Sequence, residues 1–103
     1  MISKLLRNLF KQPNKIETDK TIEIYTWQTC PYCWKAKKLL DRKGLSYQEY
    51  SIDGDEKARA LMTKRAGGKR TVPQIFVEDQ HLGGCDDLHR LESSGELDQL
   101  LLD

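Results

Sequence analysis

The sequence predicts a small three-layer α/β domain built around a mixed β-sheet. Two observations lead to this class. Apolar residues recur with strand and helix periods in the order β-α-β-α-β-β-α, and a chain of 103 residues supports one hydrophobic core but not two. A β-α-β unit needs a parallel pair of strands and a hairpin needs an antiparallel pair, so the sheet should contain both, with helices on its faces.

The first three elements form the β-α-β unit. Residues 21–26 alternate or are β-branched, which predicts a strand. Pro31 marks the start of a helix that continues through good helix formers to residue 43, and Gly44 stands at its expected end. Residues 46–52 alternate again and are the second predicted strand.

A helix, a hairpin and a last helical region follow. Residues 56–65 form a charged helix after a turn that supplies its N-cap. Residues 74–78 and 81–82 are two strands joined by a turn. Asp86 or Asp87 can cap the final helical region, which is interrupted near a Ser-Ser-Gly sequence before it reaches the C-terminus.

Residues 1–20 are expected to be an extension and linker ahead of a domain at residues 21–103. Apolar residues of segment 1–11 lie at helical spacing with basic residues mostly opposite, which predicts a short amphipathic helix. Such a segment either docks on a membrane or a partner, or it frays or lies against the domain, because so short a helix is marginally stable alone. Residues 1–20 hold five basic and two acidic residues, whereas residues 86–103 hold six acidic and one basic.

Charge and hydropathy exclude several classes of protein. A formal net charge of +1 removes the electrostatic argument for nucleic-acid binding. No apolar run approaches the roughly 20 residues that cross a bilayer, and the N-terminus lacks the features of a secretory signal. Three cysteines fit a disulfide framework poorly and suit reactive thiols in a reducing compartment, so we expect a cytoplasmic protein that binds neither membrane nor nucleic acid.

The most informative motif is Cys-Pro-Tyr-Cys at residues 30–33, between a predicted strand and a predicted helix. Cys30 meets the free N–H groups and the positive end of the helix dipole, which favour a thiolate. Cys33 follows one turn later, so the two sulfurs can join, and such a short loop makes the disulfide easy to reduce. The alternative, half of a zinc site, needs two more ligands, and only Cys85, His81 and His89 are available.

With these features the chain resembles a dithiol glutaredoxin of the thioredoxin-like fold. The resemblance rests on three motifs in order: CPYC, the Thr-Val-Pro sequence of residues 71–73 and the Gly-Gly-Cys-Asp-Asp sequence of residues 83–87. It implies a four-stranded mixed sheet flanked by helices. It also implies glutathione as co-substrate without a metal.

The resemblance assigns site residues. Cys30 and Cys33 would be catalytic, and Pro73 would be cis, with the Val72 backbone pairing with the glutathione cysteine. The N-terminus of the last helix would hold the γ-glutamyl carboxylate. The residues expected to bind glutathione are Tyr32, Arg59, Thr71, Val72, Pro73, Gly84, Cys85 and Asp86.

Arg59 is the expected partner of the glycine carboxylate, with Lys69 and Arg70 as a second possibility. One departure is Trp27, where many family members have Lys. The helix N-terminus or Arg59 must then replace that cation. Cys85, the third thiol, is expected to be a partly buried residue without a redox role.

The implied function is reduction of glutathione mixed disulfides and protein disulfides, which maintains cell redox homeostasis. The expected partners are glutathionylated or disulfide-containing proteins and, indirectly, NADPH and glutathione reductase, with the chain acting as a monomer. Two alternatives remain open. One is a module that holds a [2Fe–2S] cluster through Cys30 and glutathione at a dimer interface, although Pro31 and the CPYC form argue against it. The other is a thioredoxin with a dedicated reductase.

Overall fold

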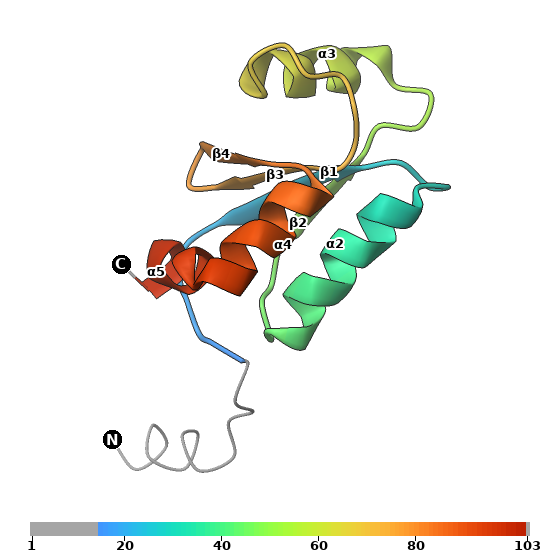
Figure 1. The fold of residues 1–103 in the computed structure, drawn as a ribbon. Coiled ribbons are helices and arrows are strands. Elements are labelled where there is room, and N and C mark those ends of the chain that lie inside the picture. The colour runs from blue at the N-terminus through green and yellow to red at the C-terminus, as the bar shows by residue number, and fades with distance from the viewer. Residues whose placement is uncertain (1–14, 103) are drawn as a thin grey trace.

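The computed structural model describes residues 15–102, so the amphipathic pattern of residues 1–11 lies outside the described part. Strands and helices follow the predicted order (Figure 1). Their bounds are β1 Ile22–Thr26, α2 Pro31–Arg42, β2 Gln48–Ser51, α3 Glu56–Arg65, β3 Gln74–Val77, β4 Gln80–Gly83, α4 Cys85–Ser94 and α5 Glu96–Leu102. Within these described residues, no helix is long and apolar enough to span a membrane.

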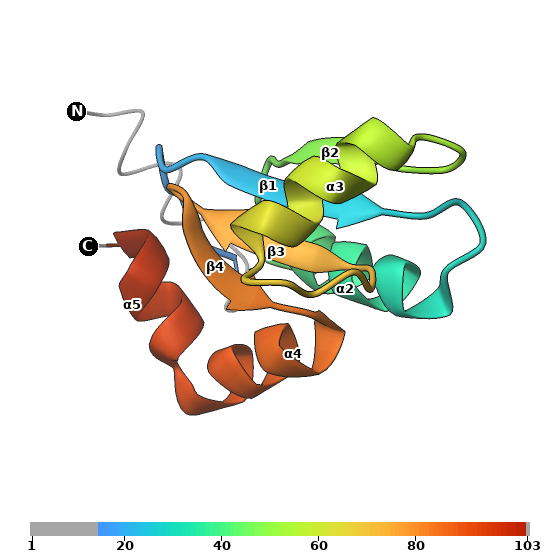
Figure 2. The same ribbon diagram turned by 90° about the horizontal axis from the view of Figure 1, so that it is seen from above.

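The sheet has the strand order β2-β1-β3-β4. β1 pairs with β2 in parallel, whereas β1 with β3 and β3 with β4 are antiparallel. Helix α3 covers one face of the sheet, and α2, α4 and α5 lie on the other (Figures 1 and 2). The predicted three-layer α/β architecture with a mixed sheet is confirmed.

Two hydrophobic clusters fill the space on either side of the sheet. The larger one joins the sheet to α2, α4 and α5, and Ile24 and Ile75 contribute the central strand residues. The smaller one lies under α3 and includes Tyr25 and Phe76. Adjacent residues of β1 and of β3 therefore face opposite clusters, as the two-residue period of a strand requires.

Helix α3 is held to the sheet by the smaller cluster, through Met62 and Ala58, and by Arg65. Met62 is the buried residue within this charged helix. Arg65 donates to Glu23 of β1 at 2.9 Å, and its guanidinium lies 4.1 Å from the ring centroid of Phe76. A cation over an aromatic face, paired with a half-buried carboxylate, thus adds to the apolar contacts of this helix.

The residues before β1 contact the domain. The Ile16 N–H donates to the Lys43 carbonyl at 3.0 Å, and the Ile16 side chain is buried in the larger cluster. Thr18 Oγ1 donates to the Leu101 carbonyl and Lys20 Nζ to the Leu100 carbonyl. The segment expected to be a linker thus bonds to α5 and to the end of α2.

Two sequence predictions differ from the structure in detail. The strand expected at residues 46–52 pairs over Gln48–Ser51. The last helical region is capped at Gly84, not at Asp86 or Asp87, because Asp87 Oδ2 reaches back to accept the Gly84 N–H at 3.0 Å. The interruption expected near the Ser-Ser-Gly sequence is Gly95, whose φ of 82° is favourable for glycine and separates α4 from α5.

Glu23 should supply stability that is lost in acid. Hydrogen bonds from Arg65 lower the pKa of its carboxyl below the ordinary 4.5, against the opposing effect of burial, and the Tyr50 hydroxyl adds to the lowering. Such a carboxyl stabilises the folded state above its unfolded pKa, and this effect disappears as the pH falls through the folded pKa. Glu23→Gln should therefore cost about 1.5–3 kcal/mol at pH 7, the value of hydrogen bonds to a charged group.

Urea unfolding at pH 7 and pH 3 measures this effect. The difference in unfolding free energy between wild type and Glu23→Gln should shrink at pH 3, where the wild-type carboxyl is losing its charge. Glu96→Gln, at an exposed position, is the matched control. An equal difference at both pH values would contradict the assignment.

Candidate active site

The end of β1 and the start of β3 place the thiol motif beside the Thr-Val-Pro sequence. β1 and β3 are antiparallel with Tyr25 opposite Gln74, so the segment that follows β1 lies beside the one that precedes β3. Cys30 Sγ lies 3.8 Å from the Val72 carbonyl oxygen. The Val72–Pro73 peptide bond is cis, as expected from the resemblance.

Cys30 is the N-cap of α2. Its Sγ accepts the Cys33 N–H at 3.1 Å, and Pro31 occupies the first helical position, where a missing N–H costs nothing. Cys30 is 9% exposed and Cys33 is completely buried. The Cys30 sulfur thus receives a backbone hydrogen bond and lies at the partially positive end of the helix.

Cys33 differs in its electrostatics. Burial and the hydrogen bond to the neighbouring Cys30 sulfur together raise the pKa of its thiol to about 12, against a smaller opposing effect of the Trp27 backbone N–H. Cys33 is therefore a neutral thiol in the reduced pair, whereas the accessible sulfur is that of Cys30. All three cysteines are unpaired in this structure.

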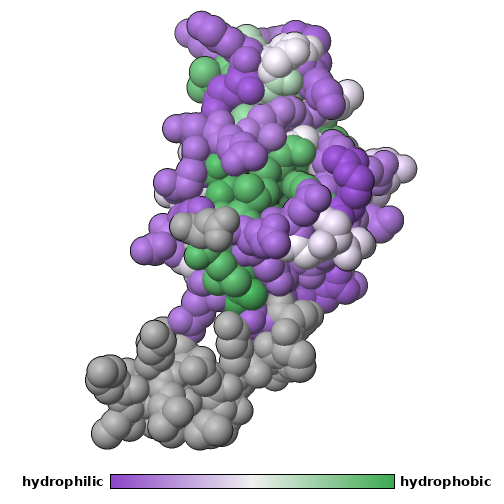
Figure 3. All heavy atoms as spheres, turned by 60° about the vertical axis from the view of Figure 1, so that its left-hand side comes forward, coloured by the Kyte–Doolittle hydropathy of each residue, from purple (hydrophilic) through white to green (hydrophobic). Residues whose placement is uncertain are grey.

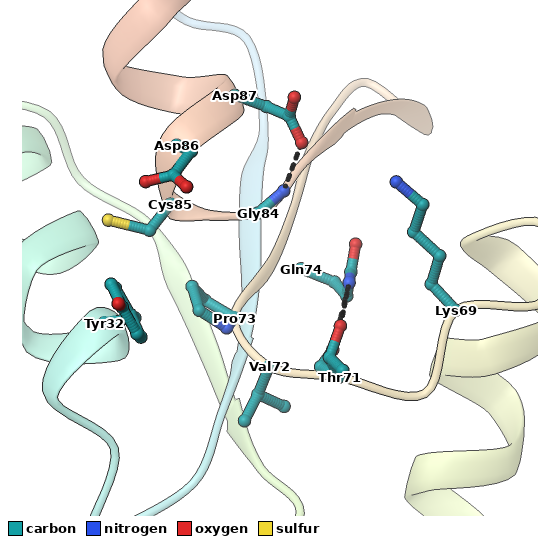
Figure 4. A pocket seen from close by; sticks show the side chains of 10 residues that line it. All are labelled: Tyr32, Lys69, Thr71, Val72, Pro73, Gln74, Gly84, Cys85, Asp86 and Asp87. Atoms are coloured by element: carbon teal, nitrogen blue, oxygen red, sulfur yellow. Dashed lines mark hydrogen bonds between the residues drawn. The ribbon is translucent and has the colours of Figure 1, made fainter.

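A cleft of about 220 Å³ lies beside the thiol motif (Figure 4). It is smaller than the roughly 300–1,000 Å³ of enclosed ligand sites, so an occupant would keep part of its surface in solvent. Seven of the expected glutathione residues line it: Tyr32, Thr71, Val72, Pro73, Gly84, Cys85 and Asp86. It is also lined by Lys69, Gln74 and Asp87, of which Gln74 was not anticipated from the sequence.

The N-terminus of α4 forms one wall of the cleft. The Asp87 carboxylate accepts a hydrogen bond from the Gly84 N–H. This bond lowers the pKa of Asp87, and Arg90 lowers it further. The amides of Cys85 and Asp86 stand in the first helical turn, where N–H groups lack partners within the helix and attract anions. Gly83 has φ 116°, and a Cβ there would collide with the Asp87 carboxylate, so this turn requires glycine.

Gln74 fixes the segment that carries Val72 and Pro73. Its Nε2 donates to the Thr71 carbonyl at 3.0 Å, and its Oε1 lies 2.6 Å from His81 Nε2. Burial, together with Lys69, lowers the pKa of His81, which keeps the imidazole neutral with Nε2 as donor. A polar residue in a strand with four buried positions is the signal that could have identified Gln74.

Arg59 does not line the cleft. Its guanidinium lies 4.8 Å from the ring centroid of Trp27, within cation–π range. Trp27 packs with Ala58 and Val72 against the smaller cluster. The Trp27–Arg59 stack is thus placed near Val72 but outside the set of residues that forms the cleft.

Cys85 is buried in the cleft wall. Burial raises the pKa of its thiol, which keeps it protonated. Its Sγ lies 3.5 Å from His89 Nδ1, one turn along α4, and that ring nitrogen also lies 2.9 Å from the Cys85 carbonyl oxygen. The absence of a redox role for Cys85 stays a prediction.

Comparison with known proteins gives a consistent result. The glutaredoxin family profile matches residues 22–82. A probable glutaredoxin of Synechocystis sp. is 61% identical over 80 residues, which cover 78% of this chain and 91% of that protein. The solution structure of glutaredoxin from Brucella melitensis superposes with a TM-score of 0.69 and 48% identity, covering 79% of this chain and 87% of that one. A crystal structure of a buckwheat glutaredoxin–glutathione complex superposes with a TM-score of 0.73 and 30% identity, covering 82% and 79%.

The buried position of Cys33 predicts selective alkylation. With iodoacetamide at pH 7, Cys33 of the Cys30→Ser variant should react more than about tenfold more slowly than Cys30 of the Cys33→Ser variant, because the thiolate is the reactive form. Peptide mass mapping over a time course measures both rates. The same reaction in 8 M urea is the control and should remove the difference. Similar rates in the native variants would show that Cys33 is not shielded.

Proposed function

Because the chain belongs to the glutaredoxin family of thiol–disulfide oxidoreductases, we propose that Cys30 is its attacking thiol and Cys33 its resolving thiol. The observation that carries this assignment is the asymmetry of the pair. Cys30 is the less buried sulfur and accepts a backbone N–H at the start of α2, whereas the Cys33 thiol is buried and has a raised pKa. The thiolate, not the thiol, is the nucleophile in disulfide exchange.

In the first step the Cys30 thiolate attacks the glutathionyl sulfur of a mixed disulfide. A bond forms between the two sulfurs, the original disulfide breaks, and the substrate leaves as a thiolate that takes up a proton. A second glutathione thiolate then attacks the glutathionyl sulfur held by Cys30. This releases glutathione disulfide and restores Cys30, so each turnover consumes one mixed disulfide and one glutathione and yields one substrate thiol and one glutathione disulfide.

With a protein disulfide as substrate, Cys33 completes the first half of the reaction. Cys30 forms a mixed disulfide with the substrate, and Cys33 loses its proton and attacks the Cys30 sulfur. The Cys30–Cys33 disulfide forms and the reduced substrate leaves. Two glutathione molecules then reduce that disulfide. The buried, protonated thiol of Cys33 suits this role, because it becomes a nucleophile only after Cys30 has reacted.

We assign the γ-glutamyl end of glutathione to the cleft. The free amides of Cys85 and Asp86 suit its carboxylate, and the exposed Asp86 carboxylate suits its ammonium group. The Val72 backbone, on the same side of the domain as Cys30, would pair with the cysteine residue of glutathione. Tyr32, which is 58% exposed at the edge of the cleft, would pack beside it.

The glycine carboxylate would then extend past Val72 toward Arg59. This placement is supported by the packing of Trp27, the partner of Arg59, against the same cluster as Val72. The carboxylate nearest to the Arg59 guanidinium, from Glu56, is 3.9 Å away, which leaves its N–H donors available for a ligand. Arg59, stacked on Trp27, thereby supplies the cation that many family members have as a lysine at the position of Trp27.

The proposed partners are glutathione, glutathionylated or disulfide-containing proteins and, through glutathione disulfide, the NADPH-dependent glutathione reductase. No metal takes part in the proposed chemistry. We assign the activity to residues 21–103 as a cytoplasmic monomer, with residues 1–20 as an extension. The family match beginning at residue 22 supports this boundary.

Serine substitutions separate the two thiol roles. Cys30→Ser should abolish turnover of a small glutathione mixed disulfide, whereas Cys33→Ser should retain it and lose reduction of a protein disulfide. The assay supplies glutathione, NADPH and glutathione reductase and follows NADPH oxidation. Equal loss of both activities in Cys33→Ser would contradict this division, and an inactive wild type would contradict the proposed function.

Substitution of Arg59 tests the glycine carboxylate site. Arg59→Gln should raise KM for a glutathione mixed disulfide about fivefold to thirtyfold with little change in kcat, because a charge-assisted pair contributes roughly 1–2 kcal/mol. The mixed disulfide of γ-glutamylcysteine, which lacks glycine, should show no such increase. Arg42→Gln, at an exposed position in the last turn of α2, is the matched control. An equal rise in KM for both substrates would place the effect elsewhere.

A further inference from the structure

A second hollow, away from the thiol cleft, lies between β4, α4 and α5. We call it the β4–α5 hollow. Leu82 of β4, Leu91 of α4 and Leu100 of α5 line it, and its volume is about 330 Å³. Figure 3 shows an apolar patch surrounded by hydrophilic residues on this side of the molecule.

The β4–α5 hollow has the character of a docking surface. β4 is an edge strand of the sheet, so its outer backbone groups lack a strand partner within residues 15–102. Leu82, Leu91 and Leu100 are each only half-buried. Contiguous apolar surface with a polar rim marks a contact site more often than isolated exposed leucines do.

The N-terminal part of the chain enters the described structure beside this surface. Ile16 donates its N–H to the carbonyl of Lys43. The Lys43 ammonium, buried at the end of α2, pairs with Glu92 of α4 at 2.9 Å and with Asp98 of α5 at 2.6 Å. The side chain of Lys43 therefore connects the backbone next to Ile16 with the junction of α4 and α5.

The reach from this point to the β4–α5 hollow is short. Leu91 precedes Glu92 directly, and Glu96, which also lines the hollow, follows the junction. Residues 12–15 can span about 14 Å when extended. Residues 1–11 would measure about 16 Å as a helix, which is long enough to cover a hollow bordered by the two-turn α5.

The chemistry of residues 1–11 matches that of the hollow. The segment holds three basic residues and no acidic residue. Glu92, Glu96 and Asp98 lie at the α4–α5 junction, where Glu92 and Asp98 also pair with Lys43. Arg90 lines the hollow as well, so acidic side chains outnumber basic ones here by one. Its apolar residues lie at helical spacing and can meet the three leucines along one face. They are Ile2, Leu5, Leu6, Leu9 and Phe10.

We propose that the apolar side of residues 2–10 docks in the β4–α5 hollow of the same molecule. The docked segment covers Leu82, Leu91 and Leu100, shields the edge of β4 and sets its basic residues against the acidic α4–α5 junction. The occupant is thus the chain's own extension, which lies outside the glutaredoxin match at residues 22–82. The thiol cleft on the other side stays open.

Limited trypsin digestion of the full chain tests the docking. Cleavage after Arg7 and Lys11 should be about tenfold faster in Leu100→Glu than in wild type, because proteolysis follows the undocked population. Leu61→Glu, at a leucine of α3 that is 56% exposed, is the matched control and should leave the rates unchanged. Circular dichroism and glutathione-dependent activity establish that both variants are folded. Equal cleavage rates in wild type and Leu100→Glu would overturn the proposal.

A second variant changes the segment and leaves the domain intact. In Leu5→Glu/Leu9→Glu, the NMR methyl signals of Leu82, Leu91 and Leu100 should shift, while those of Leu61 should not; unchanged signals would overturn the proposal. Protection from trypsin that requires vesicles containing phosphatidylserine would assign the segment to a membrane surface instead. A dimer in sedimentation equilibrium that Leu100→Glu dissociates, without a change in cleavage rate, would assign the hollow to a second copy.

Discussion

The antiparallel register of β1 and β3 is the constraint on which the thiol site depends. Tyr25 lies opposite Gln74, and this single pairing places Cys30 against Val72, 42 residues away in sequence. The core holds the register in place. Ile24 and Ile75 face the larger cluster while Tyr25 and Phe76 face the smaller one, so a slip of one residue would exchange these side chains between two differently shaped spaces. The geometry of the thiol follows from packing far from any sulfur.

Two helix N-termini meet at the edge that this register creates. α2 begins at the thiol pair, and α4 begins after the glycine turn at residues 83–84. One helix end stabilises negative charge on sulfur, and the other leaves amides free for a carboxylate. Asp87 contributes indirectly, because its carboxylate satisfies the Gly84 N–H and leaves the amides of Cys85 and Asp86 for a ligand. The site therefore uses backbone dipoles where side-chain cations are few.

Most of the fold and the centre of the site were predictable from sequence because the signals were local. The alternation of β1, the helix after Pro31 and the three motifs each depend on a few adjacent residues. What escaped prediction depends on particular side-chain contacts that the residue pattern does not specify. The cap of α4 arises from Asp87 folding back on Gly84, and the stacking of Arg59 on Trp27 joins two elements that no periodicity relates. Gln74 was missed because its contacts with Thr71 and His81 exist only once the β3–β4 hairpin has formed.

The attachment of α3, in which Arg65 takes part, affects how this protein unfolds. The ion pair with Glu23, the guanidinium over the Phe76 ring and the packing of Met62 and Ala58 hold this helix, and Met62 is its one buried residue. Elements with so few apolar contacts open at a lower free energy than the global unfolding of the domain. Local unfolding of α3 exposes Tyr25 and Phe76 and displaces Arg59. Helix α2 keeps its contacts with α4, because both lie on the opposite face of the sheet. In the proposed binding mode, the contact of Arg59 with the glycine carboxylate of glutathione is thus lost more easily than the geometry of the thiol pair.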